Sequence, residues 1–325
     1  MSVRRLLGVD VGGSSIKFGA LELDLPDSGD PPRLLGTDTL TGHNRGSFDA
    51  AMDRLADALR GLVSRVGWEE PDSVGLGVPG LVARDTGVLH EAPNLHVWDG
   101  RAPGEELHRR LGHPVALDND ANAFALAEWR WGAGRGARNA VFLTVGTGIG
   151  CGLVVENHLV RGGSGFAGEP GHIRILPRDL RLGPGTSEEA EGYAGTEAIV
   201  ARVTAHPDRA SDPVLQDRDP LTPEILHDAA ERGSRVAADV WEDVGRGLGE
   251  LLVTLVNVLN PERIVIGGGI GQAGRWLLDP ARDYLSRHSL VARHSPPGIV
   301  VAALGPEAGL LGAAALPLET GKPGA

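Results

Sequence analysis

Residues 6–23 read LLGVDVGGSSIKFGALEL, and residues 140–157 read AVFLTVGTGIGCGLVVEN. Each stretch has an apolar segment, a turn of Gly, Ser or Thr, and a second apolar segment, which predicts a β-hairpin with a tip of small residues. Such tips can bind a polyphosphate, because their backbone N–H groups face the anion and the missing side chains permit close approach. The repetition indicates two similar lobes, each of which opens with the same hairpin.

The segments between and after the hairpins alternate between helical and strand patterns. The expected helices are Ser47–Val66, Ala121–Trp131 and Ser234–Leu259, and the expected strands are Ser73–Val78, Val115–Leu117 and Arg263–Ile266. This alternation favours an α/β protein with a mixed sheet flanked by helices.

The composition excludes several classes of protein. The chain has 325 residues, 41% of them apolar, and a formal net charge of −12, so it lacks the basic footprint of a nucleic-acid binder. Its one cysteine, Cys151, rules out an intrachain disulfide and a multi-thiolate metal site. The sequence has neither a secretory signal pattern nor an apolar stretch long enough to cross a bilayer. We expect a cytoplasmic protein that contacts neither nucleic acid nor membrane.

Three glycine-rich segments are candidates for nucleotide binding. Asp10 lies beside the first hairpin tip, where its carboxylate can hold a hydrated Mg²⁺ against phosphates, although a solvated Asp beside a plain turn fits equally well. The second tip, Thr144–Gly150, can likewise be a phosphate-binding turn or a plain hairpin turn. Gly267–Gly271, which reads GGGIG after an expected strand, can pack against an adenine ring or simply turn the chain. None of these matches the spacing of a P-loop.

Polar residues gather in three other places. Asp118, Asn119 and Asp120 stand between an expected strand and helix; one of them would suffice to cap the helix, and ligands bind at the carboxyl edge of α/β sheets. Glu169 and His172 lie three residues apart, in what is otherwise a turn with solvated side chains. The run 188–191 is acidic and by itself indicates a solvated helix face.

In this order the motifs resemble the ROK family of sugar kinases, from about Leu6 to Ala315. The matching segments are GVDVGGSSIKFG (8–19), GVPGLV (77–82), APNL (92–95), DNDANAFALAEW (118–129), LTVGTGIGCGLV (143–154), GEPGHI (168–173), IVIGGG (264–269) and EAGLLGAA (307–314). The E-x-G-H box after T-x-G-T-G-I-G is the most diagnostic of them.

The resemblance implies the two-lobed actin-like ATPase fold of sugar kinases, with a ligand cleft between the lobes. The lobes are expected to be residues 1–119, completed by a C-terminal helix at 307–318, and residues 120–306. Family members are commonly homodimers or homotetramers, and some are repressors with a DNA-binding domain ahead of this core. Because the core here starts at Leu6, we expect no such domain.

The resemblance also implies the roles of single residues. Asp120 is expected to be the catalytic base and Asp10 to hold Mg²⁺ through water. ATP is expected to contact Asp10, Gly12, Gly13, Ser14, Thr144, Gly146, Thr147 and Gly148 with its phosphates, and Gly268 and Gly269 with its adenosine. The hexose is expected to contact Asn94, Asn119, Asp120, Glu169, His172 and Glu191.

The sequence departs from the family at one place. Family members usually carry a C-x-C-G-x-x-G-C-x-E zinc box after the E-x-G-H box, whereas Leu180–Glu191 reads LRLGPGTSEEAE and contains no cysteine. We therefore expect that the zinc is lost and that Glu191, which matches the final Glu of the box, is kept.

The leading prediction is an ATP-dependent kinase that phosphorylates the 6-hydroxyl of glucose. Another hexose or an N-acetylated amino sugar as substrate, and polyphosphate as donor, stay open. A sugar-sensing protein without activity could use the same core, but the presence of both Asp10 and Asp120 argues against it.

Overall fold

The computed structural model describes residues 2–25, 29–175 and 187–319. The chain divides into two compact units, of which the first comprises Met1–Gly136, Leu159–Gly168 and Ala303–Ala325, and the second Ala137–His158 and Glu169–Ala302. Both predicted hairpins are confirmed. They are β1 (Ser2–Val11) with β2 (Ser15–Leu25), and β8 (Ala140–Val145) with β9 (Ile149–Val155).

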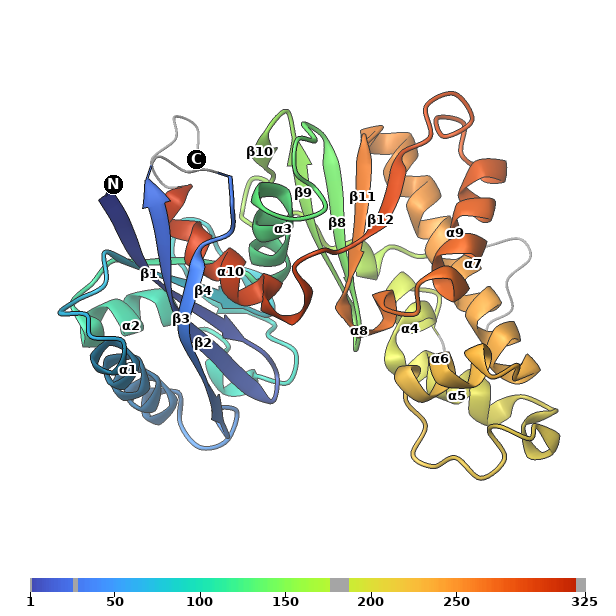
Figure 1. Cartoon of the computed structure of the whole chain (residues 1–325), viewed down its shortest axis with the longest axis horizontal. Helices are drawn as coiled ribbons and strands as arrows, with labels where there is room; N and C mark the ends of the chain where they lie inside the picture. The colour runs from blue at the N-terminus through green and yellow to red at the C-terminus, as the bar shows by residue number, and fades with distance from the viewer. Residues whose placement is uncertain (1, 26–28, 176–186, 320–325) are drawn as a thin grey trace. The chain divides into compact units, whose positions relative to one another are not determined.

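The first unit is built on a mixed sheet with the strand order β3-β2-β1-β4-β7 (Figure 1). The added strands are β3 (Arg33–Thr41), β4 (Ser73–Val78) and β7 (Val115–Asn119). β1, β2 and β3 pair antiparallel, whereas β1, β4 and β7 run parallel. The carboxyl ends of the three parallel strands therefore meet at one edge of this sheet.

Helices cover both faces of the first sheet (Figure 1). They are α1 (Phe48–Arg65), α2 (Pro103–Leu111), α3 (Asp120–Arg130) and α10 (Ala308–Ala315). Successive side chains of β1 point to opposite faces, so that Leu7 packs with α1 and α2 while Leu6 packs with α3 and α10. The first unit is thus a three-layer α/β structure.

α10 returns from the end of the chain to the first unit, where it packs on α3, β1 and β4. The approach is close: a Cβ atom on Gly75 would lie 1.7 Å from the carbonyl oxygen of Ala313, and one on Gly312 would lie 1.7 Å from that of Ala123. Because α3 packs against α10, it belongs to the first unit. This differs from the boundary that the sequence suggested at residues 119 and 120.

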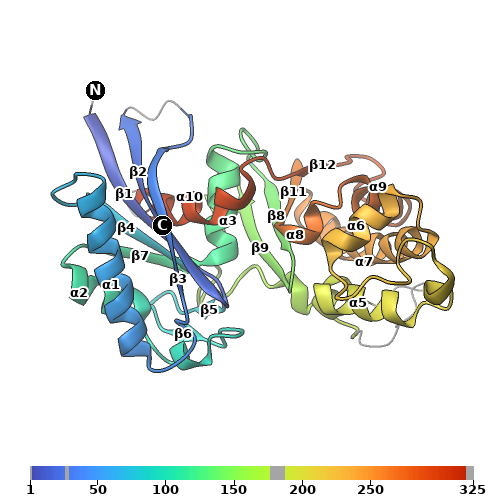
Figure 2. The ribbon, with the colours of Figure 1, turned by 60° about the horizontal axis from the view of Figure 1, so that its bottom comes forward.

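The second unit repeats the same strand order, as β10-β9-β8-β11-β12, and Figure 2 labels the last four of these strands. Its further strands are β10 (His158–Leu159), β11 (Arg263–Gly267) and β12 (Gly298–Val301). Its helices are α4 (Ala190–Ala194), α5 (Thr196–Ala205), α6 (Pro223–Glu231), α7 (Arg235–Leu259), α8 (Gly268–Gly271) and α9 (Arg275–His288). α7 supplies the centre of the core, including Trp241 and Leu252, and its C-cap residue, Asn260, adopts the left-handed conformation.

Short elements complete the two units. They are the strands β5 (Leu81–Val82) and β6 (Leu89–His90) and the 3₁₀ turns η1 (His96–Trp98), η2 (Pro170–His172), η3 (Arg209–Ser211), η4 (Gly305–Glu307) and η5 (Leu316–Leu318). In the described part of the chain, no helix is both long enough and apolar enough to cross a membrane.

Candidate functional site

The carboxyl edge of the parallel strands in the first unit gathers several predicted residues. Asp10 on β1 lies level with Gly77 on β4, and Gly77 lies level with Asp118 on β7. α3 begins at Asp120, whose Cα would lie 3.7 Å from a Cβ atom on Gly77. The first hairpin tip follows Asp10 directly, so the predicted base and the predicted phosphate turn share this edge.

The carboxylate of Asp10 is suited to binding a cation. Burial raises the pKa of its carboxyl above the ordinary value, nearby Lys17 lowers it, and Glu307 raises it. No described residue donates a hydrogen bond to the carboxylate, although a Cβ atom on Gly309 would lie only 2.5 Å from its Oδ2. A partly buried carboxylate without a protein donor fits a hydrated Mg²⁺, which compensates for the lost solvation.

The first hairpin tip, Gly12–Ser14, is bound by side chains from another segment of the chain. The backbone N–H of Gly12 donates to the carbonyl of Ser15 at 2.9 Å. The carbonyl of Gly12 lies 2.8 Å from Nε2 of His43, and the carbonyl of Gly13 accepts from Nδ2 of Asn44 at 2.9 Å. Sequence reasoning missed His43 and Asn44, since only their polar character in a loop after β3 marked them.

Asn94 borders the same tip. It is exposed and adopts φ 60°, a left-handed conformation that Asn tolerates better than most residues. A Cβ atom on Gly13 would lie 3.2 Å from the Cβ of Asn94. The loop that carries Asn94 is fixed at Ala92, whose Cα would lie 2.7 Å from a Cβ atom on Gly80. The structure therefore places a predicted sugar residue next to the predicted phosphate turn.

Asn119 is the N-cap of α3. Its Oδ1 accepts from the backbone N–H groups of Ala121 at 2.8 Å and Asn122 at 3.2 Å, and its Nδ2 donates to the carbonyl of Gly80 at 3.0 Å. The capping interpretation thus describes its main contacts. The side-chain amide still has one proton that these bonds do not use, and this proton is what Asn119 can offer to a sugar.

Asp118 supports its neighbours. Its Oδ2 accepts from Nε of Arg161 at 2.6 Å, and its Oδ1 accepts from Nδ2 of Asn122 and from the backbone N–H of Asn119, both at 2.8 Å. This buried, fully engaged carboxylate fixes the junction from which Asp120 projects.

The second hairpin tip is held in a similar way. The carbonyl of Gly146 accepts from the backbone N–H of Thr196 at 3.0 Å and from its Oγ1 at 3.1 Å. The backbone N–H of Gly146 donates to the carbonyl of Gly148 at 2.9 Å. Gly268, with φ 82°, runs so close to β8 that a Cβ atom there would lie 2.3 Å from the carbonyl oxygen of Val145. The predicted adenosine segment and the second tip are therefore neighbours in the second unit.

Glu191 binds to the second hairpin. Its Oε2 accepts from the backbone N–H of Ile149 at 3.0 Å, and a Cβ atom on Gly148 would lie 2.3 Å from the same oxygen. Gly171, in the E-x-G-H box, also borders this oxygen, because a Cβ atom on Gly171 would lie 3.4 Å from Oε2 of Glu191. Glu191 thus links the predicted sugar box to the predicted phosphate tip.

Glu169 and His172 lie in the electrostatic field of Glu191. Burial raises the pKa of Glu169, His172 lowers it, and Glu191 raises it. The pKa of His172 is raised chiefly by its hydrogen bond to Glu189 at 3.2 Å, whereas burial lowers it. The negative charges of Glu191, Glu189 and Glu169 raise it further. Carboxylates beside an imidazole supply the directional donors and acceptors that a polyol needs.

The segment in place of the zinc box lies mostly outside the described residues, because 176–186 are not described. Elsewhere in the described chain, no cluster of three or more His, Cys, Asp or Glu side chains is arranged to hold a metal ion. The absence of structural zinc stays a prediction. Metal analysis of protein purified without a His tag is expected to find less than one zinc per chain, and a strong chelator is expected to leave the melting temperature unchanged. One tightly held zinc would contradict it.

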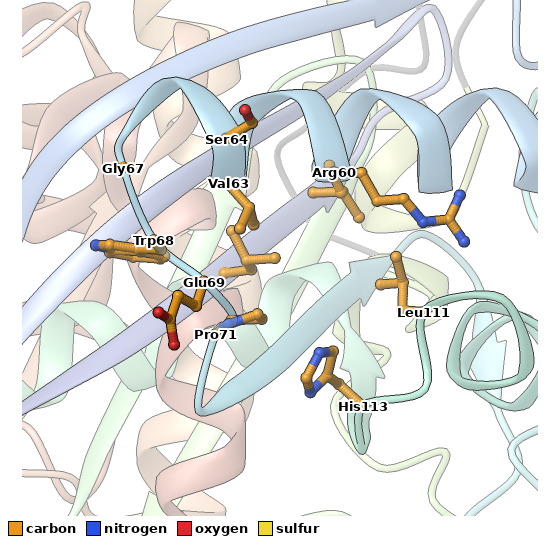
Figure 3. Close-up of a pocket in the computed structure, with 11 residues that line it drawn as sticks. Arg60, Val63, Ser64, Gly67, Trp68, Glu69, Pro71, Leu111 and His113 are labelled. Atoms are coloured by element: carbon orange, nitrogen blue, oxygen red, sulfur yellow. The ribbon is translucent and has the colours of Figure 1, made fainter.

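A separate pocket of about 390 Å³ lies in the first unit, beneath the end of α1 (Figure 3). Trp68, Pro71, Leu111 and His113 contribute to its lining, near the amino ends of β4 and β7. None of the predicted site residues lines this pocket; those of the first unit lie at or just beyond the carboxyl ends of β1 and β7 or, for Asn94, in the loop after β6.

Comparison with known proteins agrees with these features. The sequence matches the ROK family over residues 6–320. The chain belongs to the ROK family. The glucokinase of Streptomyces coelicolor is 35% identical over 323 residues, which cover 96% of this chain and 97% of the relative. A ROK glucokinase from Streptomyces griseus, solved with glucose and AMPPNP, is 33% identical with a TM-score of 0.77 and covers 96% of this chain and 98% of its own.

The family also includes regulators. The xylose repressor of Caldicellulosiruptor bescii is 31% identical over 250 residues, which cover 75% of this chain and 61% of the repressor.

The predicted fold class is confirmed: this ROK chain has the mixed α/β, actin-like ATPase fold of the family's sugar kinases.

Proposed function

We propose that this chain is an ATP-dependent sugar kinase that transfers the γ-phosphoryl group to the 6-hydroxyl of glucose or a related hexose. The observation that carries the proposal is that backbone N–H groups at both hairpin tips are unpaired among the described residues. Among the described residues, the backbone N–H groups of Gly13, Ser14 and Thr147 have no hydrogen-bond acceptor. Consecutive unpaired N–H groups beside glycines are suited to phosphate oxygens.

The residues of the first unit divide the work between donor and acceptor. Gly13 and Ser14 bind phosphates through their backbone N–H groups, Gly12 shapes the turn beside them, and Asp10 would hold Mg²⁺. When bound there, Mg²⁺ would supply neutralisation of the charge that develops on the phosphates during transfer. Asp120 orients the attacking hydroxyl and accepts its proton, while Asn94 and Asn119 hold other hydroxyls of the sugar.

The residues of the second unit have matching tasks. Thr144, Gly146, Thr147 and Gly148 contribute to phosphate binding, and Gly268 and Gly269 border the adenosine. Glu169, His172 and Glu191 bind sugar hydroxyls. The similarity to glucokinases over nearly the whole of both chains favours glucose as the sugar.

Replacing Glu169 or His172 with Ala is expected to raise the KM for the sugar about 10–100-fold, because a hydrogen bond to a charged group contributes about 1.5–3 kcal/mol. The KM for ATP is expected to change little. Initial rates over both substrate concentrations measure this, with Glu242→Ala on the exposed side of α7 as the control. A rise in the KM for ATP alone would contradict the sugar assignment.

A panel of sugars with ATP and Mg²⁺, scored by kcat/KM from coupled ADP release, tests the proposed function. We expect glucose to rank first and ATP to exceed polyphosphate as donor. A sugar-sensing protein is the alternative that the repressor relatives favour. It would bind a sugar without releasing ADP, and the same assay separates the two.

A further inference from the structure

Two carbonyl groups of the first hairpin tip, those of Gly12 and Gly13, are fixed by side chains that are distant in sequence. Nε2 of His43 lies 2.8 Å from the carbonyl of Gly12, and Nδ2 of Asn44 donates to the carbonyl of Gly13 at 2.9 Å. A trans peptide is planar, with its C=O and N–H on opposite sides. Holding these two carbonyls therefore turns the N–H groups of Gly13 and Ser14 to the opposite side, where neither has an acceptor among the described residues.

The tautomer of His43 follows from its partner. A carbonyl oxygen can only accept, so Nε2 carries the proton and donates it. Nδ1 is buried and has no hydrogen-bond partner among the described residues, as expected of a neutral ring. Burial lowers the pKa of His43, the hydrogen bond to Gly12 raises it, and the charge of Arg54 lowers it. His43 thus acts as a neutral, single-proton donor to the turn.

The position of His43 is itself fixed. The side chain is fully buried, and its ring meets Trp98 edge-on at 6.2 Å between centroids. Trp98 meets Phe48 in the same way at 5.4 Å. Arg54 of α1 donates to the carbonyl of Gly42 at 2.8 Å, which anchors the backbone just before His43. A donor held this firmly can dictate the orientation of the flexible glycine turn.

The second hairpin provides an independent parallel. There the carbonyl of Gly146 accepts two hydrogen bonds from Thr196, and the N–H of Thr147, on the other side of that peptide, has no acceptor among the described residues. Different residues on different elements thus produce the same arrangement at both tips.

We propose that His43 and Asn44 are positioning residues for nucleotide binding: they hold the Gly12–Ser14 turn with its N–H groups presented to the phosphates of the donor. This inference rests on the proposed function. Without these side chains the glycine turn samples other orientations, and the nucleotide must select the competent one.

The test compares His43→Leu, His43→Gln and Asn44→Ala with the wild type. Isothermal calorimetry gives the Kd for Mg·ADP, and initial rates give KM for ATP and for glucose. Losing one such hydrogen bond weakens binding by about 3–10-fold. We expect this loss in the Kd for Mg·ADP and the KM for ATP with His43→Leu and Asn44→Ala, and little change in the KM for glucose. His43→Gln, which can still donate to Gly12, is expected to recover most of it.

Leu59→Val is the matched control, because it perturbs the same hydrophobic core of the first unit in the second half of α1, away from His43 and the turn. We expect it to lower the melting temperature and to leave the Kd for Mg·ADP unchanged. Wild-type affinity in folded His43→Leu and Asn44→Ala would overturn the inference, as would an equal loss in Leu59→Val. If His43→Leu does not fold, Asn44→Ala, whose side chain is only half-buried, decides alone. If the wild type itself does not bind Mg·ADP and does not form ADP from ATP when sugar is present, the proposed function fails as well.

Discussion

Replacing Asp120 with Asn is expected to lower kcat for sugar phosphorylation by about 10²–10⁴-fold, the usual cost of removing a positioned general base. Asp120 is the first residue of α3, and its Oδ1 accepts the backbone N–H of Ala121 at 2.8 Å. The amide oxygen of Asn can keep this hydrogen bond, so the helix start and sugar binding should survive. What Asn cannot do is accept the proton of the attacking hydroxyl.

Single-turnover rates and sugar binding by calorimetry measure the effect of this substitution. Asp57→Asn on the exposed face of α1 is the matched control, because among the described residues its carboxylate pairs only with Arg60, at the surface. We expect the control to keep wild-type kcat. A folded Asp120→Asn protein with wild-type kcat would show that Asp120 is not the base.

Replacing Gly148 with Ala is expected to lower kcat/KM for the sugar about 10–100-fold. A Cβ atom at this position would lie 2.3 Å from Oε2 of Glu191, well inside van der Waals contact. The carboxylate must move, and it then loses its hydrogen bond from the backbone N–H of Ile149 at 3.0 Å. A hydrogen bond to a charged group contributes about 1.5–3 kcal/mol, which sets this range.

A double-mutant cycle with Glu191→Ala isolates this mechanism. Once the carboxylate is gone, Gly148→Ala should cost little more, so the two effects should be strongly non-additive. Gly61→Ala on the exposed face of α1 is the control, because a Cβ atom there meets nothing within 4 Å. It should keep wild-type activity and stabilise the fold by about 0.5–1 kcal/mol. Additive losses in the cycle would mean that Gly148 acts independently of Glu191.

The hairpins and the elements after them were predictable because their signals are local. Apolar runs on either side of a glycine tip predict a hairpin wherever they occur, and Ser47 and Asn119 are N-cap residues beside the helices that they start. The family motifs added the order of the candidate residues. The positions of Asp10, Asn119 and Asp120 at one sheet edge then follow from three parallel strands.

The remaining features depend on contacts between distant segments. His43 reaches Gly12 across 31 residues, and Glu191 reaches Ile149 across 42, and neither pairing leaves a periodic signal in the sequence. The same reason explains the place of α3. Its association with the first unit depends on α10, from the other end of the chain, and on the glycine at 312 that lets the two helices approach.

The identity of the product tests the central claim most directly. The wild-type protein is incubated with ATP, Mg²⁺ and glucose, and the products are followed by ³¹P and ¹³C nuclear magnetic resonance. We expect one ADP for each phosphomonoester formed, with the new phosphate on the C6 oxygen of glucose. Phosphate on another hydroxyl, release of inorganic phosphate alone, or no glucose-dependent ADP would contradict it.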